Sequence, residues 1–161
     1  MKILDKIEEI FCGTALLTTT IILFINVMLR YIFKSSTSWA EELIKYLMIW
    51  IAFIGGGICA RTGAHVSIDF IHEYLSSKSK KKVFIVVNTI AAIFAGIMMT
   101  YGIKVINFTI SMGQVSPALQ IPMWIPYLAI PLGFFLMTIR FVQEVFKGIK
   151  GDKDDDLKGV N

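Results

Sequence analysis

Four long apolar stretches, separated by polar or basic segments, form the main pattern of the chain. They run over Ile10–Phe33, Leu43–Ala60, Val83–Ile103 and Trp124–Val142. A hydrocarbon core of about 30 Å requires roughly 20 helical residues, because each residue adds about 1.5 Å along a helix. All four stretches are at or near this length. The pattern therefore predicts an all-α integral membrane protein with four transmembrane helices.

The connecting segments predict where these helices end and bend. The third helix should continue past its apolar part to Met112 and end before Gly113. Pro131, inside the last helix, lacks a backbone donor, so we expect a kink near Tyr127–Pro131. Residues 62–82 place apolar side chains at helical spacing opposite charged ones. This pattern predicts a short amphipathic interfacial helix between the second and third transmembrane helices.

Small residues indicate how the second and third helices pack. Both helices carry them four apart, at Ala52, Gly56 and Ala60 and at Ala92, Gly96 and Thr100. Such stripes let two helix backbones approach closely in lipid, so we expect these two helices to pack together. We also expect Trp50 at a helix interface, because its indole N–H needs a partner in hydrocarbon.

Charged residues near the helix ends favour local structural roles. Arg30 is expected to reach the outer headgroups. Ser38 and Glu41 form a Ser-x-x-Glu pattern typical of a helix start, and Glu41 and Lys45 are spaced to pair. The acidic residues within 5–9 should point away from the apolar face of an amphipathic first turn that lies along the cytoplasmic interface. A functional role is the alternative for the outer charges, because ionisable residues at membrane depth are commonly functional.

The distribution of basic residues predicts the orientation. The N-terminal segment has two Lys, and the second connection and the C-terminal segment have five Lys or Arg each. The first connection has two and the third has one. Because Lys and Arg are enriched on the cytoplasmic side, we predict that both termini lie in the cytoplasm. The net charge is only +4, and the basic residues cluster in the segments outside the spans. This distribution is typical of residues that set membrane topology and not of a nucleic-acid-binding surface.

The composition leaves no room for a soluble domain beside four spans. Of 161 residues, 55% are hydrophobic and 17% are charged, against about 25% charged in soluble domains. We therefore predict one transmembrane domain over residues 1–150 and a disordered acidic cytoplasmic tail over 151–161. The first apolar stretch follows acidic residues and is too long for a cleaved signal peptide, so we expect it to stay in the mature protein.

The chain lacks the residue patterns of a catalytic or cofactor site. Both histidines lie on the inner connection, no Cys-x-x-Cys occurs, and the middle of each span has no acidic residue. Membrane haem, thiol oxidoreductase and proton-coupled transport sites need such residues. We expect no cofactor, no bound metal and no enzymatic activity. The pattern favours a membrane subunit with a structural role.

Two groups of residues are similar to the signatures of one family. The chain resembles the small membrane subunit, the DctQ-like family, of the tripartite ATP-independent periplasmic (TRAP) transporters over about residues 5–147. The first group is Trp39-Ala-Glu41-Glu42-Leu43, then Trp50, Gly55, Arg61 and His65-x-x-Ile68-Asp69. The second is Gly113-x-x-Ser116-Pro117-Ala118-Leu119-x-Ile121-Pro122-x-Trp124, then Tyr127, Pro131 and Gly133.

This resemblance implies a role in a heteromeric transporter of the bacterial inner membrane. The family's small subunit binds a large membrane subunit that carries the substrate and sodium sites and moves as an elevator. A periplasmic binding protein delivers a carboxylate solute of the C4-dicarboxylate or sialic-acid class and docks transiently on the outer face. The small subunit, surrounded by lipids, belongs to the stationary scaffold. The resemblance thus implies a brace for sodium-coupled uptake.

Two sets of candidate residues follow from the residue patterns and the resemblance together. Subunit-interface or structural candidates are Arg30, Trp39, Glu41, Glu42, Lys45, Trp50, Gly56, Arg61, His65 and Asp69. Candidates for the face that receives the periplasmic protein are Ser36, Ser38, Gln114, Ser116 and Gln120.

Two other functions stay open. A self-sufficient small oligomeric transporter or channel would need an ionisable residue facing a central cavity, and Arg30, Glu42 and Lys45 are the nearest candidates. A membrane enzyme would have to rely on His65 and Asp69, which lie four apart on one helical face. We interpret that pair as an interfacial or subunit-contact feature.

Overall fold

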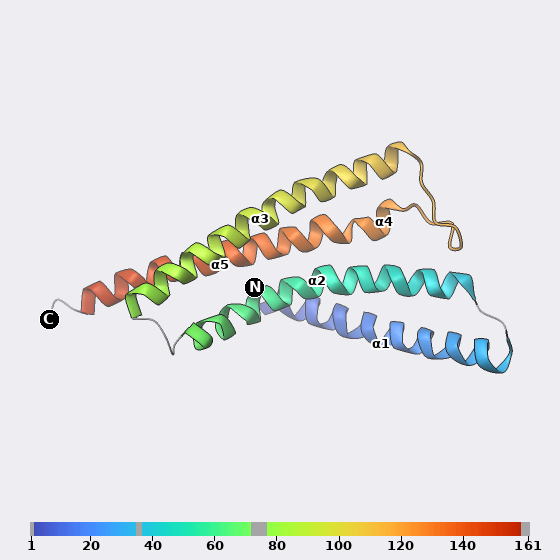
Figure 1. Cartoon of the computed structure of the whole chain (residues 1–161), viewed down its shortest axis with the longest axis horizontal. Helices are drawn as coiled ribbons and strands as arrows, with labels where there is room; N and C mark the ends of the chain where they lie inside the picture. The colour runs from blue at the N-terminus through green and yellow to red at the C-terminus, as the bar shows by residue number, and fades with distance from the viewer. Residues whose placement is uncertain (1, 35–36, 72–76, 159–161) are drawn as a thin grey trace.

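The computed structural model describes residues 2–34, 37–71 and 77–158, which are almost entirely helical (Figure 1). The helices are α1 (Lys2–Ile32), α2 (Ser38–Ile71), α3 (Ser77–Ser111), the short α4 (Trp124–Tyr127) and α5 (Ala129–Lys158). Among the described residues, four helical segments are long and apolar enough to span a membrane: Leu4–Ile32, Ser38–Ala60, Lys82–Ser111 and Trp124–Ile149. The predicted all-α fold with four transmembrane helices is confirmed.

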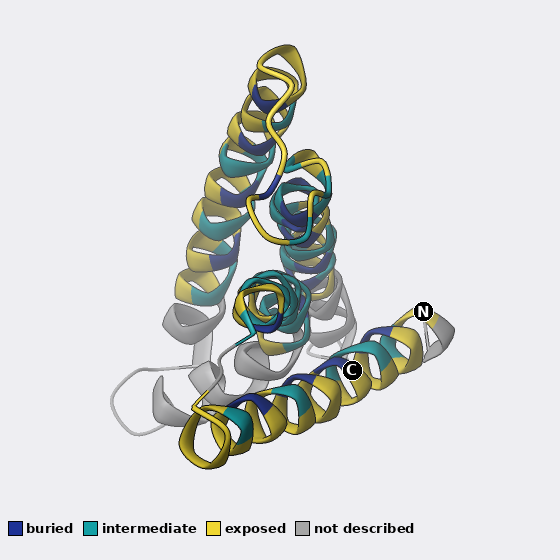
Figure 2. Cartoon of the chain, turned by 90° about the vertical axis from the view of Figure 1, so that its right-hand side faces the viewer, coloured by how far each residue is buried: buried dark blue, intermediate teal, exposed yellow. Residues whose placement is uncertain are grey.

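The long helices form a single row in the order α1, α2, α5, α3 (Figure 1). α1 packs on α2, α2 packs on α5, and α5 packs along α3 over the greatest length. The backbones of α1 and α5 do not approach each other within the described residues. In Figure 2, which looks along the helices from the end that carries the connection between α3 and α4, α1 lies at one edge with most of its surface exposed. The row is therefore open, with each face available to lipid or to a partner.

The expected packing of the second helix against the third is wrong, because α5 lies between them. α2 and α3 barely touch, and nothing lies within 4 Å of a Cβ built on Gly96. Gly56 instead lies against Met137 of α5. A Cβ on Gly133 of α5 would come within 2.6 Å of the backbone oxygen of Phe53 in α2. The small residues of α2 thus serve close packing, but their partner is the last helix.

Polar and apolar side chains are distributed as a membrane requires. Large apolar residues such as Ile21, Phe24, Ile90 and Phe94 are exposed. Several polar ones are buried and bonded to the backbone; the hydroxyl of Thr19, for example, donates to the oxygen of Ala15 at 2.7 Å. In hydrocarbon, polar groups need internal partners, whereas apolar groups gain nothing by being hidden.

The predicted ends and bends of the helices largely agree with the structure. α3 ends at Ser111, one residue before the predicted Met112, and Gly113 follows with a positive φ of 60°. The helix breaks between α4 and α5 at Leu128, within the region predicted to kink. α2 begins at Ser38 itself, so Thr37 takes the position before the helix.

Three predictions stay predictions. α2 continues as one helix to Ile71, so within the described residues no break separates the predicted interfacial helix from α2. α5 continues to Lys158, and the division into a membrane domain over 1–150 and a disordered tail over 151–161 is untested. The orientation of the termini also awaits measurement. We name the end of the row that carries residues 112–123 the outer end, as the basic residues predict.

Candidate functional site

Glu42 of α2 binds the connection between α3 and α4, which we call the outer loop (residues 112–123). Its Oε2 accepts hydrogen bonds from the backbone N–H groups of Ala118 and Leu119, each at 2.8 Å. Its Oε1 accepts the hydroxyl of Tyr46 at 2.6 Å. Glu42 and Tyr46 are four residues apart, so both side chains lie on the same face of α2. One carboxylate thereby joins two segments that are 76 residues apart in sequence.

The outer loop has a defined internal structure. The N–H of Ser116 donates to the oxygen of Ile121 at 2.9 Å, and the N–H of Met123 donates to the oxygen of Gln114 at 3.0 Å. Gln120 has a left-handed backbone with φ of 54°, a conformation that costs free energy in a residue other than glycine. Such a turn persists only when its surroundings hold it. Glu42 supplies that constraint by binding two consecutive N–H groups.

The docking-face candidates occupy different positions in this structure. The side chains of Ser38, Gln114 and Gln120 are exposed near the outer end. Ser116 is fully buried, so it would contribute to a docking face only through the shape of the loop. Ser36 lies outside the described residues.

A second polar cluster lies at the opposite end of the row, which we name the inner ion cluster (Asp5, Glu8 and Arg140). Arg140 of α5 donates to Glu8 of α1 and lies 3.0 Å from the Oδ1 of Asp5. Arg140 and Glu8 are both buried. The cluster connects two helices whose backbones do not pack together, so long side chains make the link. Glu8 points away from the exposed apolar residues Ile7 and Ile10, as expected, but it faces α5 and not solvent, because Arg140 pairs with its charge.

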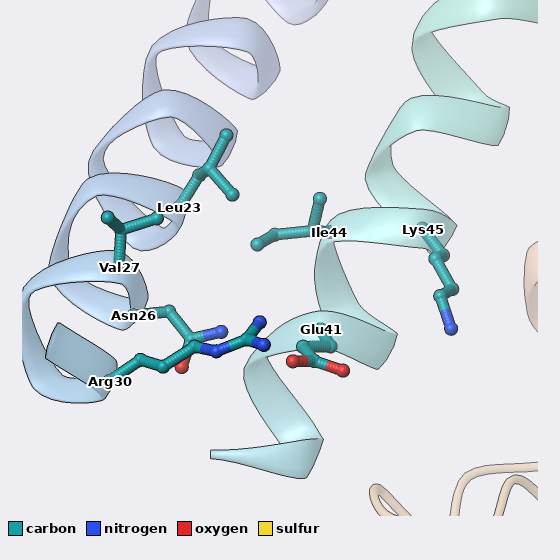
Figure 3. Close-up of a pocket in the computed structure, with 7 residues that line it drawn as sticks. All are labelled: Leu23, Asn26, Val27, Arg30, Glu41, Ile44 and Lys45. Atoms are coloured by element: carbon teal, nitrogen blue, oxygen red, sulfur yellow. The ribbon is translucent and has the colours of Figure 1, made fainter. Parts of the chain in front are cut away.

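Between α1 and α2, near the outer end, a pocket of about 250 Å³ opens; we call it the outer pocket (Figure 3). It is lined by apolar Leu23, Val27 and Ile44 and by polar Asn26, Arg30, Glu41 and Lys45. The Oδ1 of buried Asn26 accepts both the N–H and the hydroxyl of Thr37, each at 3.2 Å. These bonds fix the turn from α1 into α2.

The predicted pairing of Glu41 with Lys45 does not form as an ion pair in the described part of the chain. Both side chains are exposed, and Figure 3 shows the Lys45 ammonium directed away from the Glu41 carboxylate. At this exposed position an ion pair contributes little stability. Glu41 thus lines the outer pocket, whereas its neighbour Glu42 binds the outer loop.

The remaining interface candidates are placed as follows. Trp50 is half-buried and meets Phe11 of α1 edge to face, with ring centroids 6.1 Å apart, so it lies at the α1–α2 interface. Trp39 is exposed. Arg61, His65 and Asp69 belong to α2, but their side chains lie outside the described part of the structure. Among the described residues, no cluster of three His, Cys, Asp or Glu side chains could hold a metal ion.

Sequence reasoning missed Arg140 and the partners of Glu42. Arg140 entered the prediction only as a basic residue near the inner end. A usable signal was present: Arg140 and the acidic residues at 5–9 have opposite charge and are predicted at the same end of the bundle. The sequence carries no comparable signal for the bond between Glu42 and the outer loop. Its donors are backbone N–H groups, which every residue other than proline possesses.

Known proteins resemble this chain over most of its length. The family model described as "Tripartite ATP-independent periplasmic transporters, DctQ component" matches residues 19–151. The chain is 32% identical to the C4-dicarboxylate TRAP transporter small permease protein DctQ of Rhodobacter capsulatus, covering 91% of this chain and 78% of that protein.

Two further relatives differ in length. The ectoine TRAP transporter small permease protein TeaB of Halomonas elongata is 26% identical, covering 91% of this chain and 76% of the relative. The sialic acid TRAP transporter permease protein SiaT of Haemophilus influenzae is 30% identical, covering 89% of this chain but 23% of that longer protein. The match spans well over half of the chain and includes Glu42 and the outer loop. This chain therefore belongs to the DctQ component family of the tripartite ATP-independent periplasmic transporters.

Proposed function

We propose that this chain is the stationary brace of a three-component uptake system. In this role it binds a large membrane subunit that carries the substrate and sodium sites and moves as an elevator. The solute is a carboxylate of the C4-dicarboxylate or sialic-acid class, delivered by a periplasmic binding protein. The open row of helices supports this role, because its faces expose apolar side chains and leave a broad surface for another membrane protein.

The relatives supply independent support for a large partner. In the sialic acid relative, the matched segment is 23% of a longer polypeptide that is named a permease protein. The isethionate TRAP transporter permease protein DctMQ of Oleidesulfovibrio alaskensis is likewise matched over 23% of its length. A domain fused to a longer permease chain in some proteins, and separate in others, is expected to bind the remainder of that permease when separate.

The outer loop suits the reception of a soluble partner. Glu42 holds its backbone, and the side chains of Gln114 and Gln120 are exposed, with the Nε2 of Gln120 donating to the backbone oxygen of Pro117 at 2.9 Å. A preorganised loop loses little conformational entropy on binding. We assign the docking of the periplasmic protein to this loop and to the start of α2.

Reconstitution tests this function. The large subunit is placed in proteoliposomes with or without this chain, and uptake of labelled succinate or sialic acid is measured with binding protein outside and an inward sodium gradient. Uptake is expected only when both membrane proteins are present, and collapse of the sodium gradient should abolish it. Full uptake by the large subunit alone would contradict the bracing role. Flux through vesicles that hold this chain alone would favour the self-sufficient transporter or channel.

A further inference from the structure

The outer pocket carries three charges in a row above an apolar floor. Figure 3 shows the guanidinium of Arg30 directed between the two helices, the carboxylate of Glu41 next to it, and the ammonium of Lys45 beyond Glu41. The order of charges is positive, negative, positive. Neither the hold on the outer loop nor the inner ion cluster uses these side chains.

The charges of the pocket are not neutralised within the described part of the chain. No ion pair joins Arg30, Glu41 or Lys45 to another described side chain at 4 Å or less. Ionisable groups in a membrane span are costly unless they pair or reach the interface. Two cations and one carboxylate leave a net positive charge, so an added phosphate group would find complementary partners.

The depth of the lining residues matches the boundary between headgroups and acyl chains. Arg30 lies two residues before the end of α1, and Glu41 lies three residues after the start of α2. These groups are therefore within one helical turn of the helix ends. Leu23 lies nine residues before the end of α1, roughly 13 Å deeper at about 1.5 Å per residue. The lining is thus charged at the helix ends, through Arg30 and Glu41, and mainly apolar deeper in the bilayer, where Lys45, seven residues after the start of α2, is the one charged lining residue.

We propose that the outer pocket binds a phospholipid with a primary ammonium headgroup, such as phosphatidylethanolamine, from the leaflet at this end. Arg30 binds the phosphodiester, Glu41 binds the ammonium, and one acyl chain lies against Leu23 and Val27. Charge-assisted hydrogen bonds from guanidinium to phosphate are among the strongest polar contacts in proteins. Glu41 sets the preference among lipids, because an ammonium with N–H donors satisfies a carboxylate and a glycerol or choline headgroup does so less well. This lipid site is independent of the proposed transport function.

Native mass spectrometry of the full chain in detergent, titrated with defined lipids, tests the site. Phosphatidylethanolamine should bind more tightly than phosphatidylcholine or phosphatidylglycerol of the same acyl chains. Arg30→Gln should weaken binding of phosphatidylethanolamine about tenfold, the effect typical of losing a charge-assisted hydrogen bond. Glu41→Gln should reduce the preference for phosphatidylethanolamine over phosphatidylglycerol. Soluble phosphoethanolamine and inorganic phosphate should compete poorly, because neither supplies an acyl chain.

Lys104→Gln is the matched control. Lys104 lies on α3 at the opposite edge of the row, with its ammonium 5.0 Å from the centre of the Tyr101 ring, and it does not line the pocket. This variant should bind lipid as the unmodified chain does. Melting temperatures in lipid-free detergent separate lost binding from lost folding, and Glu41→Gln provides a second variant if Arg30→Gln unfolds. Equal binding of all three lipids, an unaffected Arg30→Gln variant that remains folded, or full competition by inorganic phosphate would each overturn the proposal.

Discussion

Replacing Arg140 by glutamine should strongly destabilise the protein. The substitution leaves the carboxylates of Glu8 and Asp5 without their guanidinium partner at a buried position. Breaking a buried ion pair by removing one partner typically costs about 3–5 kcal/mol. The side chains of Arg140 and Glu8 are 5% and 4% exposed, so solvent screens their interaction little. Asp5 is 19% exposed and contributes less, which places the expected loss nearer to about 3 kcal/mol.

The free energy of unfolding is measured by titration of mixed micelles with sodium dodecyl sulfate, followed by tryptophan fluorescence. Because the cluster fastens α1 to α5, hydrogen exchange should also accelerate in the first turns of α1. Lys147→Gln on the same helix is the control. Its partner Glu144 lies 2.6 Å away, but the Lys147 side chain is 66% exposed, so the loss should stay below about 1 kcal/mol.

A double substitution makes the test specific to the pair. Glu8→Gln together with Arg140→Gln removes both charges, and its loss should be smaller than the sum of the two single losses. If Arg140→Gln unfolds within about 1 kcal/mol of the unmodified chain, the reasoning on the inner ion cluster is refuted.

The other two predictions concern the outer loop and the α2–α5 contact. Glu42→Gln should speed hydrogen exchange of the Ala118 amide about tenfold, because a neutral acceptor forms weaker bonds; the neighbouring Glu41→Gln should not, and equal rates in both variants would remove the assigned role. Gly133→Ala should cost about 2 kcal/mol in the same unfolding titration, because the added methyl group meets the backbone of α2. Gly96→Ala, with open space around it, should be neutral or slightly stabilising, and a similar loss at both glycines would show that packing is not the cause.

Hydropathy and proline chemistry were sufficient to predict the elements of this fold. The four spans follow from the length of the apolar stretches, and the break at Leu128 follows from the missing donor of Pro131. Family membership agrees with the prediction of a transporter subunit of the bacterial inner membrane that is not an enzyme. These features depend on local properties of the chain, which a single sequence displays.

The order of the helices and the polar links depend on distant residues, so the sequence did not reveal them. A stripe of small residues shows that a helix can be approached closely but does not identify its neighbour; Gly56 met α5 and not α3. The first turn of α1 has the pattern of a solvent-facing amphipathic helix, and only the position of Arg140, 132 residues beyond Glu8, changes that interpretation.

The single row of helices has a consequence for permeation. One copy of the described chain is a single helix thick, about 10–12 Å, and therefore does not enclose an aqueous channel. Any aqueous route for a charged solute would have to be walled on its other sides by another polypeptide. Conductance recorded from a preparation of this chain would therefore report self-association into a ring, and the size of that ring would be the quantity to measure.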